Sequence, residues 1–202
     1  MVNILPKQYL NKVTAKREVF DLPEKSPDKV IGISRSDWFF YIITGLLIIG
    51  LKLAWRNVPP TEPWIFLTPL VKILAFITGS SFIHQATGFW NPLLGVSITK
   101  DCAGMNYFLI AHSLLVISNI RFFSGRVKTP AYFVFFISAY LFTVIANVSR
   151  VLITIKLGQP GMIPAVLDGK PHLILGTFIY FFFLLACNGL ATLVSRRFTR
   201  ME

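Results

Sequence analysis

Long apolar stretches separated by short polar segments dominate the chain. Residues 38–55 read WFFYIITGLLIIGLKLAW, with a tryptophan at each end, and further apolar runs occupy 104–123, 131–157 and 172–195. Each run is close to the roughly 20 residues that a helix needs to cross a bilayer, and tryptophan is typical of the membrane–water interface. The pattern predicts an all-α fold, a polytopic integral membrane helix bundle.

The region 64–99 does not read as one clean helix. Its first part, WIFLTPLVKILAFITGSSFI, is apolar but contains Pro69 and Lys72, and its second part is rich in glycine and polar residues. GVSIT, at 95–99, is expected to be extended. As a single crossing, this region would place the lysine-rich N-terminus outside. We therefore favour a re-entrant or doubly crossing element and expect five or six spans in total.

Charge is concentrated outside the apolar runs. Only 14% of the 202 residues are charged, against roughly 25% in an ordinary soluble domain, and 54% are hydrophobic. The segment 1–37 holds much of the charge and no apolar run long enough for a secretory signal. We expect a polar, basic N-terminal segment over 1–37 and a membrane-embedded domain over 38–202.

The net charge of +11 is explained by the membrane rather than by nucleic acid. Lysine and arginine commonly flank membrane helices on the cytoplasmic side, and no base-reading or phosphate-cradling motif accompanies them. The basic loop 121–128 and the basic tail 196–200 are therefore predicted to be cytoplasmic. The connections near 100–102 and 158–171 then face outward, in a multi-pass protein of the cytoplasmic (inner) membrane.

Helix direction brings three reactive residues to this outer face. Cys102 begins a helix that runs inward, Arg150 lies near the end of a helix that runs outward, and His172 begins the next helix inward. A cysteine at a helix N-terminus is favoured as thiolate by the dipole, although Asp101 opposes this unless it caps the helix. Cys187 lies deep in the last run, so a disulfide between the two cysteines is not expected.

Each of these residues also has an ordinary explanation. A lone cysteine often only fills space, an arginine can extend to the headgroups, and an interfacial histidine can bind water. Arg150 has a polar neighbour, however, because Asn147 lies three residues earlier on the same helical face. Gly176, one turn after His172, would allow another helix to approach closely. His112 is expected to be a packed polar residue, and the role of His84 is left open.

A thiol, an imidazole and a guanidinium together suit amide-bond cleavage. The thiolate attacks the carbonyl, histidine protonates the leaving amine, and arginine stabilises the developing oxyanion. We expect Cys102 to be the nucleophile, His172 the acid/base and Arg150 the electrostatic stabiliser, with Asn147 orienting Arg150. The chain has no CxxC pair and no carboxylate within a confident span, and no cofactor or metal is expected.

These residues also form a recognisable series of motifs. Cys102-Ala103-Gly104, Asn147-Val148-Ser149-Arg150 and the helix that begins with His172 resemble the exosortase/archaeosortase family of membrane transpeptidases. The resemblance covers roughly 64–195, and the small number of spans is similar to a compact branch, the type called exosortase K. Members carry a cysteine in C-A/S-G, an arginine in N-x-x-R and a histidine that opens a later helix.

The resemblance implies a hydrolase of the cysteine protease type that acts in protein sorting. Its substrates would be exported proteins that end in a short motif, a membrane helix and a basic cluster. It would cleave them at the outer face of the cytoplasmic membrane and transfer them to an acceptor, a surface polysaccharide or a lipid. Gly104, in the C-A-G motif, is expected to be a substrate-binding or supporting residue, as are Asn147 and Gly176.

Two other classes of function fit parts of the pattern. A small transporter or channel subunit could use Arg150 to bind an anion, and a non-catalytic scaffold could use the polar face to bind partner helices. Proton or cation transport is disfavoured, because the acidic residues after Asp37 all lie outside the confident spans. A transporter would tolerate Cys102→Ala, whereas a sorting enzyme would not.

Overall fold

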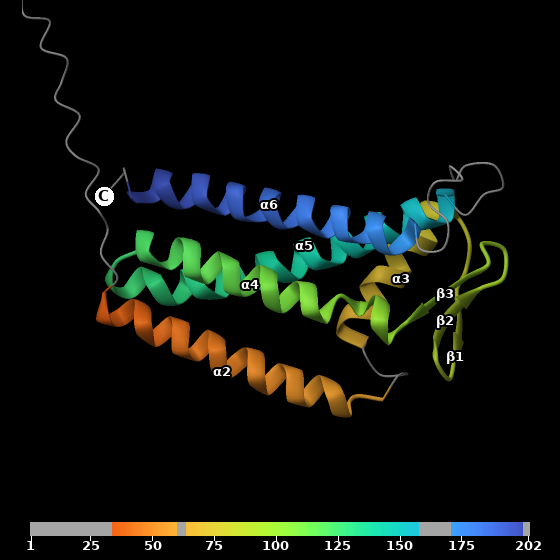
Figure 1. Ribbon diagram of the computed structural model, residues 1–202, viewed down its shortest axis with the longest axis horizontal. Coiled ribbons are helices and arrows are strands. Elements are labelled where there is room, and N and C mark those ends of the chain that lie inside the picture. The colour runs from red at the N-terminus through yellow and green to blue at the C-terminus, as the bar shows by residue number, and fades with distance from the viewer. Residues whose placement is uncertain (1–33, 60–63, 158–170, 200–202) are drawn as a thin grey trace, which may run out of the picture. The chain divides into compact units, whose positions relative to one another are not determined.

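Helices make up most of the described structure. The computed structural model describes residues 34–59, 64–157 and 171–199. Four helices run alongside one another (Figure 1). They are α2 (Arg35–Asn57), α4 (Met105–Asn119), α5 (Lys128–Leu157) and α6 (Pro171–Thr199). All four apolar runs are thus confirmed as helices. Residues 1–33 of the predicted N-terminal segment lie outside the described residues, whereas Ser34 caps α2 and Arg35–Asp37 form its first turn.

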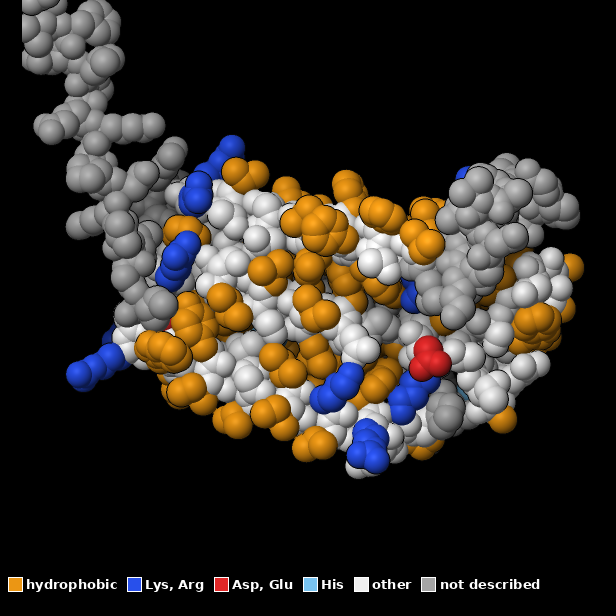
Figure 2. All heavy atoms as spheres, in the orientation of Figure 1, with side chains coloured by type: hydrophobic (Ala, Val, Ile, Leu, Met, Phe, Trp, Pro, Cys, Tyr) orange, Lys and Arg blue, Asp and Glu red, His pale blue; other side chains and the backbone are white. Residues whose placement is uncertain are grey.

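Four segments of the described chain are long and apolar enough to cross a membrane: Arg35–Asn57, Lys100–Phe122, Gly125–Lys156 and Ile174–Phe198. Large apolar side chains cover the outside of these helices (Figure 2). In water such a surface would be unfavourable, whereas in a bilayer it faces lipid. This arrangement indicates a membrane protein. A fifth or sixth span is not confirmed.

Helix α4 is extended by flanking 3-10 turns to an apolar segment of 23 residues. Helix α3 (Trp64–Thr78), in contrast, has 15 residues, or about 22 Å of length, less than the roughly 30 Å of a bilayer core. Its start lies beside the middle of α5, where the Tyr140 hydroxyl donates to the Ile65 carbonyl at 2.6 Å. This bond compensates for Pro69, which has no N–H to offer the carbonyl four residues earlier. A hydroxyl from another helix thus satisfies the carbonyl that the proline leaves free.

A small antiparallel sheet follows α3. Its strands β1 (Ile83–Gln85), β2 (Gly88–Asn91) and β3 (Val96–Thr99) lie in sequence order, at one end of the helices (Figure 1). The extended conformation expected for this stretch is confirmed. The mostly helical fold is as predicted, but the three-stranded sheet was not expected; glycine and asparagine in this region favour tight turns and short strands over a continued helix.

Helix α4 lies at the centre of the packing. Nine of its 15 residues are buried, whereas α2 buries three of 23. His112, which is fully buried, stacks on Phe108 and meets the rings of Tyr132 and Phe136 edge-on. The expectation that His112 is a packed polar residue is confirmed.

At the end opposite the sheet, three segments meet. The first turn of α2 contacts the start of α5 through a buried ion pair, in which the Lys128 ammonium lies 2.6 Å from the Asp37 carboxylate. The ring of Phe123, before α5, lies 6.4 Å from that of Phe198 at the end of α6. The start of α2, the 120–128 connection and the end of α6 therefore share one end of the bundle.

Candidate functional site

Cys102 lies in a short 3-10 turn, Lys100–Ala103, which joins β3 to α4. This differs slightly from the prediction, which placed the thiol at the start of the long helix. The turn ends at Gly104, whose φ of 73° is left-handed, and α4 begins one residue later. Cys102 is half-buried, and Asp101 is exposed and does not cap α4. The thiol is held on a sharp corner at the sheet end of the bundle.

Gly104 is required at this corner for two reasons. Its positive φ disfavours other residues, and a Cβ there would lie 2.2 Å from Nδ2 of Asn147. Because that space is free, the Asn147 amide donates to the Ala103 carbonyl at 3.0 Å. The asparagine of the N-x-x-R motif thus fixes the backbone of the Cys102 turn directly.

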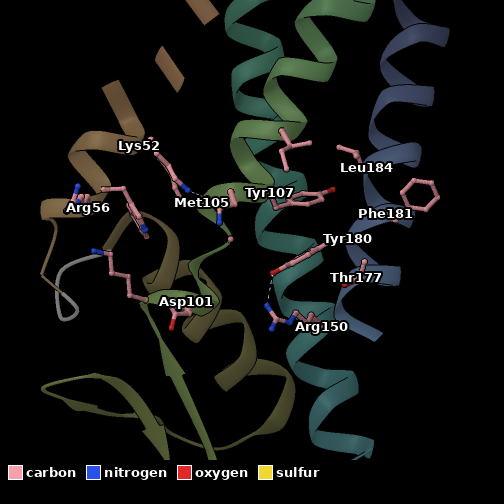
Figure 3. A pocket seen from close by; sticks show the side chains of 15 residues that line it. Lys52, Arg56, Asp101, Met105, Tyr107, Arg150, Thr177, Tyr180, Phe181 and Leu184 are labelled. Atoms are coloured by element: carbon pink, nitrogen blue, oxygen red, sulfur yellow. Dashed lines mark hydrogen bonds between the residues drawn. The ribbon is translucent and has the colours of Figure 1, made fainter. Parts of the chain in front are cut away.

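A tyrosine connects Asn147 to Arg150. The guanidinium of Arg150 donates to the Tyr180 hydroxyl at 3.0 Å, and this hydroxyl in turn donates to Oδ1 of Asn147. Figure 3 shows Arg150 and Tyr180 directed toward each other from α5 and α6. We expected Asn147 to orient Arg150, and the connection runs through Tyr180, which was not predicted from the sequence. Two signals could have found it: Tyr180 is the one tyrosine among the phenylalanines of the last apolar run, and it lies one helical turn after Gly176 on the same face.

Gly176 provides the close helix approach that its position suggests. A Cβ there would lie 2.9 Å from Nε and 3.3 Å from Cδ of Arg150. The side chain of Arg150 therefore lies directly against the backbone of α6. Without a side chain at position 176, α6 can pack over Arg150 and bring Tyr180 into hydrogen-bond range.

Cys102 and Arg150 line the same small cavity. Its volume is about 170 Å³, and its lining comes from β3, the 3-10 turn and α5. The remaining residues are Val96, Ser97, Ile98, Asn147, Val151 and Thr154. Two of the three expected reactive residues, together with the supporting Asn147, therefore meet in one cavity at the sheet end of the bundle.

The third expected residue, His172, is the second residue of α6, one turn before Gly176. Its side chain lies outside the described part of the structure. His84 is on β1, with its ring 5.2 Å from that of Phe89.

The second thiol, Cys187, is buried in the helix packing, and both cysteines are free. No disulfide joins them, as expected. Among the described residues, no three His, Cys, Asp or Glu side chains are grouped so that they could hold a metal ion. The arrangement around Cys102 is therefore a thiol, a guanidinium and an amide that share one cavity.

No protein-family model matches the chain, and neither a curated protein nor a solved structure matches it.

Proposed function

We propose that the protein is a membrane cysteine transpeptidase or protease that cleaves a C-terminal sorting signal of exported proteins. The single observation that carries this proposal is the cavity shared by Cys102, Asn147 and Arg150. These residues come from two motifs more than forty positions apart, and each is positioned by its own contacts. A scaffold protein would give no reason to place a half-buried thiol beside an intramembrane guanidinium.

In the proposed reaction the Cys102 thiolate attacks the carbonyl carbon of the scissile amide, after its proton passes to His172. Arg150 stabilises the negative charge that develops on the carbonyl oxygen. The C–N bond then breaks, His172 returns the proton to the leaving amine, and a thioester remains on Cys102. An acceptor nucleophile or water attacks the thioester and restores the thiol.

Asn147 and Tyr180 act as positioning residues in this proposal. Asn147 holds the carbonyl of Ala103, next to the nucleophile, and Tyr180 holds the guanidinium. Position 172 lies one helical turn before Gly176, and residues four apart share a helical face. This relation supports His172 as the acid/base, because Gly176 is the point at which α6 contacts Arg150.

We further propose that the sheet end of the bundle faces outward from the cytoplasmic membrane. The opposite end carries the 120–128 connection and the end of α6, with Arg121, Arg126, Arg196 and Arg197. The start of α2 lies there as well. All of these charges then follow the positive-inside tendency.

The direct test is the C-terminal sequence of exported proteins in cells that express the protein. Proteins that end in a membrane helix and a basic cluster are expected to lose that end with the wild type and to keep it with Cys102→Ala. The matched control is Cys187→Ala, which removes the buried thiol and leaves the proposed site intact. Identical C-termini in wild-type and Cys102→Ala cells would refute the proposal, provided that both proteins reach the membrane in equal amounts.

A further inference from the structure

A second, larger cavity lies beside the Cys102 cavity, and Arg150 lines both. Its volume is about 790 Å³, and its lining comes from α2, the 3-10 turn, α4, α5 and α6. In Figure 3, Lys52 and Arg56 border it from α2, and Thr177, Tyr180, Phe181 and Leu184 border it from α6. A volume of this size suits a small molecule or part of a lipid.

The charged part of this cavity is strongly cationic. Lys52, Arg56, Lys100 and Arg150 line it, against the single carboxylate of Asp101. Within the described part of the chain, none of the four cations pairs with a carboxylate.

Both lysines among these four cations are held by neutral groups. Lys52 donates to the side-chain amide oxygen of Asn106, and Lys100 donates to the Val58 carbonyl at 2.5 Å. Neutral partners position these cations but leave their charge uncompensated. An anion that enters the cavity would therefore meet several donors already in place.

In the proposed orientation these cations lie at the outward-facing sheet end, where the positive-inside tendency does not predict a basic cluster. The positive-inside tendency accounts for the basic residues at the 120–128 end, but not for a cluster at the sheet end. Lys52 and Arg56 lie one turn apart and so share a face of α2. That face borders the cavity, so extension toward the headgroups does not by itself explain their position.

Most of the remaining cavity wall is apolar or aromatic, with Asn106 and Thr177 as its polar members, and part of it lies deeper along the helices. Ile110 is six residues after Gly104 on α4, and Leu184 is seven residues after Thr177 on α6. At 1.5 Å per residue, the wall continues for about 9–10 Å below the charged part. The cavity thus combines a cationic region with an apolar wall, as an amphiphile requires.

We propose that this cavity binds the phosphate headgroup of a membrane lipid, with the start of its hydrocarbon chain against α4 and α6. Phosphate is the anionic group that membrane lipids carry, and lysine and arginine donate to it strongly. The proposal does not depend on the chemistry of Cys102, because binding needs only the cations and the apolar wall. The two experiments can therefore give different results: the protein could cleave sorting signals without binding lipid, or bind lipid without cleaving sorting signals.

The test is a binding titration of the purified full-length protein in an uncharged detergent. The probes are phosphatidylglycerol, a diacylglycerol with the same chains, and glycerol phosphate, with bound probe counted by native mass spectrometry. We expect phosphatidylglycerol to bind at least about tenfold more tightly than either other probe, because it alone offers both the charge and the chain. Equal binding of diacylglycerol would overturn the phosphate contact, and equal binding of glycerol phosphate would overturn the lipid assignment.

Variants locate the site. Lys52→Gln/Arg56→Gln is expected to weaken phosphatidylglycerol binding at least about tenfold, since two charge-assisted donors are lost. Both side chains are exposed, so folding should be preserved, and thermal unfolding verifies this. The matched control, Arg126→Gln/Arg197→Gln, removes two exposed arginines at the opposite end. If both double variants lose phosphatidylglycerol binding equally, the lipid is attracted by the overall positive charge of the protein. That result would refute the proposed site.

Discussion

At the scale of single residues, the conformation of the Cys102 turn depends on a glycine. Gly104→Ala would force a side chain into a left-handed backbone conformation, at a cost of about 1–2 kcal/mol. It would also displace Asn147, whose Nδ2 would lie 2.2 Å from the new Cβ. Loss of the bond from Asn147 to Ala103 adds about 1–3 kcal/mol. We expect a clear decrease in the free energy of unfolding, measured by thermal or denaturant unfolding in detergent.

Gly95→Ala is the matched control for this variant. Gly95 also has a positive φ, 62°, but no atom lies within 4 Å of the position that a Cβ would take there. Gly95→Ala should therefore destabilise the protein only by the cost of placing a side chain in the left-handed backbone conformation. If Gly95→Ala and Gly104→Ala destabilise the protein equally, the close approach of Asn147 contributes nothing to stability.

Two stacked tyrosines allow a second comparison. Tyr107 and Tyr180 stack with their ring centroids 4.9 Å apart, but only the Tyr180 hydroxyl has partners among the described residues. Tyr180→Phe should leave Asn147 and Arg150 without their bridging hydroxyl and destabilise the protein by about 1–3 kcal/mol. Tyr107→Phe removes a buried hydroxyl without a partner in the described part of the chain and should be neutral or stabilising. Unfolding measurements on the two variants test this. A greater loss of stability in Tyr107→Phe than in Tyr180→Phe would contradict the role of the Tyr180 hydroxyl as the bridge between Arg150 and Asn147.

At the scale of elements, α3 depends on a compensation between helices. Tyr140→Phe should destabilise the protein by about 1–3 kcal/mol, because the Ile65 carbonyl loses its donor. In a Pro69→Ala background the same change should cost much less, since the restored amide N–H can bond to that carbonyl. A double-mutant cycle on the free energy of unfolding measures the coupling. A coupling energy near zero would mean that Tyr140 does not substitute for the missing amide.

The elements were largely predictable from the sequence, and their contacts were not. A sustained apolar run identifies a helix such as α5 because length and hydropathy are local properties. The link from Arg150 to Tyr180 depends on which face of α6 packs against α5, and no periodicity within one helix contains that information. The same holds for Lys128, which meets Asp37 across 91 positions of the chain. Gly176 was the one contact position predicted from the sequence. A glycine in an apolar helix, one turn after His172, indicated that another helix packs closely there.

At the scale of the whole molecule, α3 bears on the number of crossings. Its start lies beside Tyr140, in the middle of α5, and the chain continues from its end into the sheet. In a bilayer, a helix of this length and position would enter the bundle from the sheet end without crossing it. Four crossings then return the chain to the side from which it entered. Of the two forms favoured from the sequence for 64–99, re-entrant and doubly crossing, this arrangement is consistent with the re-entrant form.

The β1–β2 turn distinguishes four crossings from six. With four crossings, Thr87, which is exposed in this turn, lies on the outer side; with six, the stretch near 84 would lie in the cytoplasm. Thr87→Cys, made in a Cys102→Ala/Cys187→Ala background, should react in intact cells with a charged alkylating reagent that cannot cross membranes. Arg126→Cys in the same background should react only after the cells are opened, because it lies at the opposite end. Protection of Thr87→Cys until the cells are opened would instead favour a doubly crossing 64–99 region and would move the Cys102 turn away from the proposed arrangement.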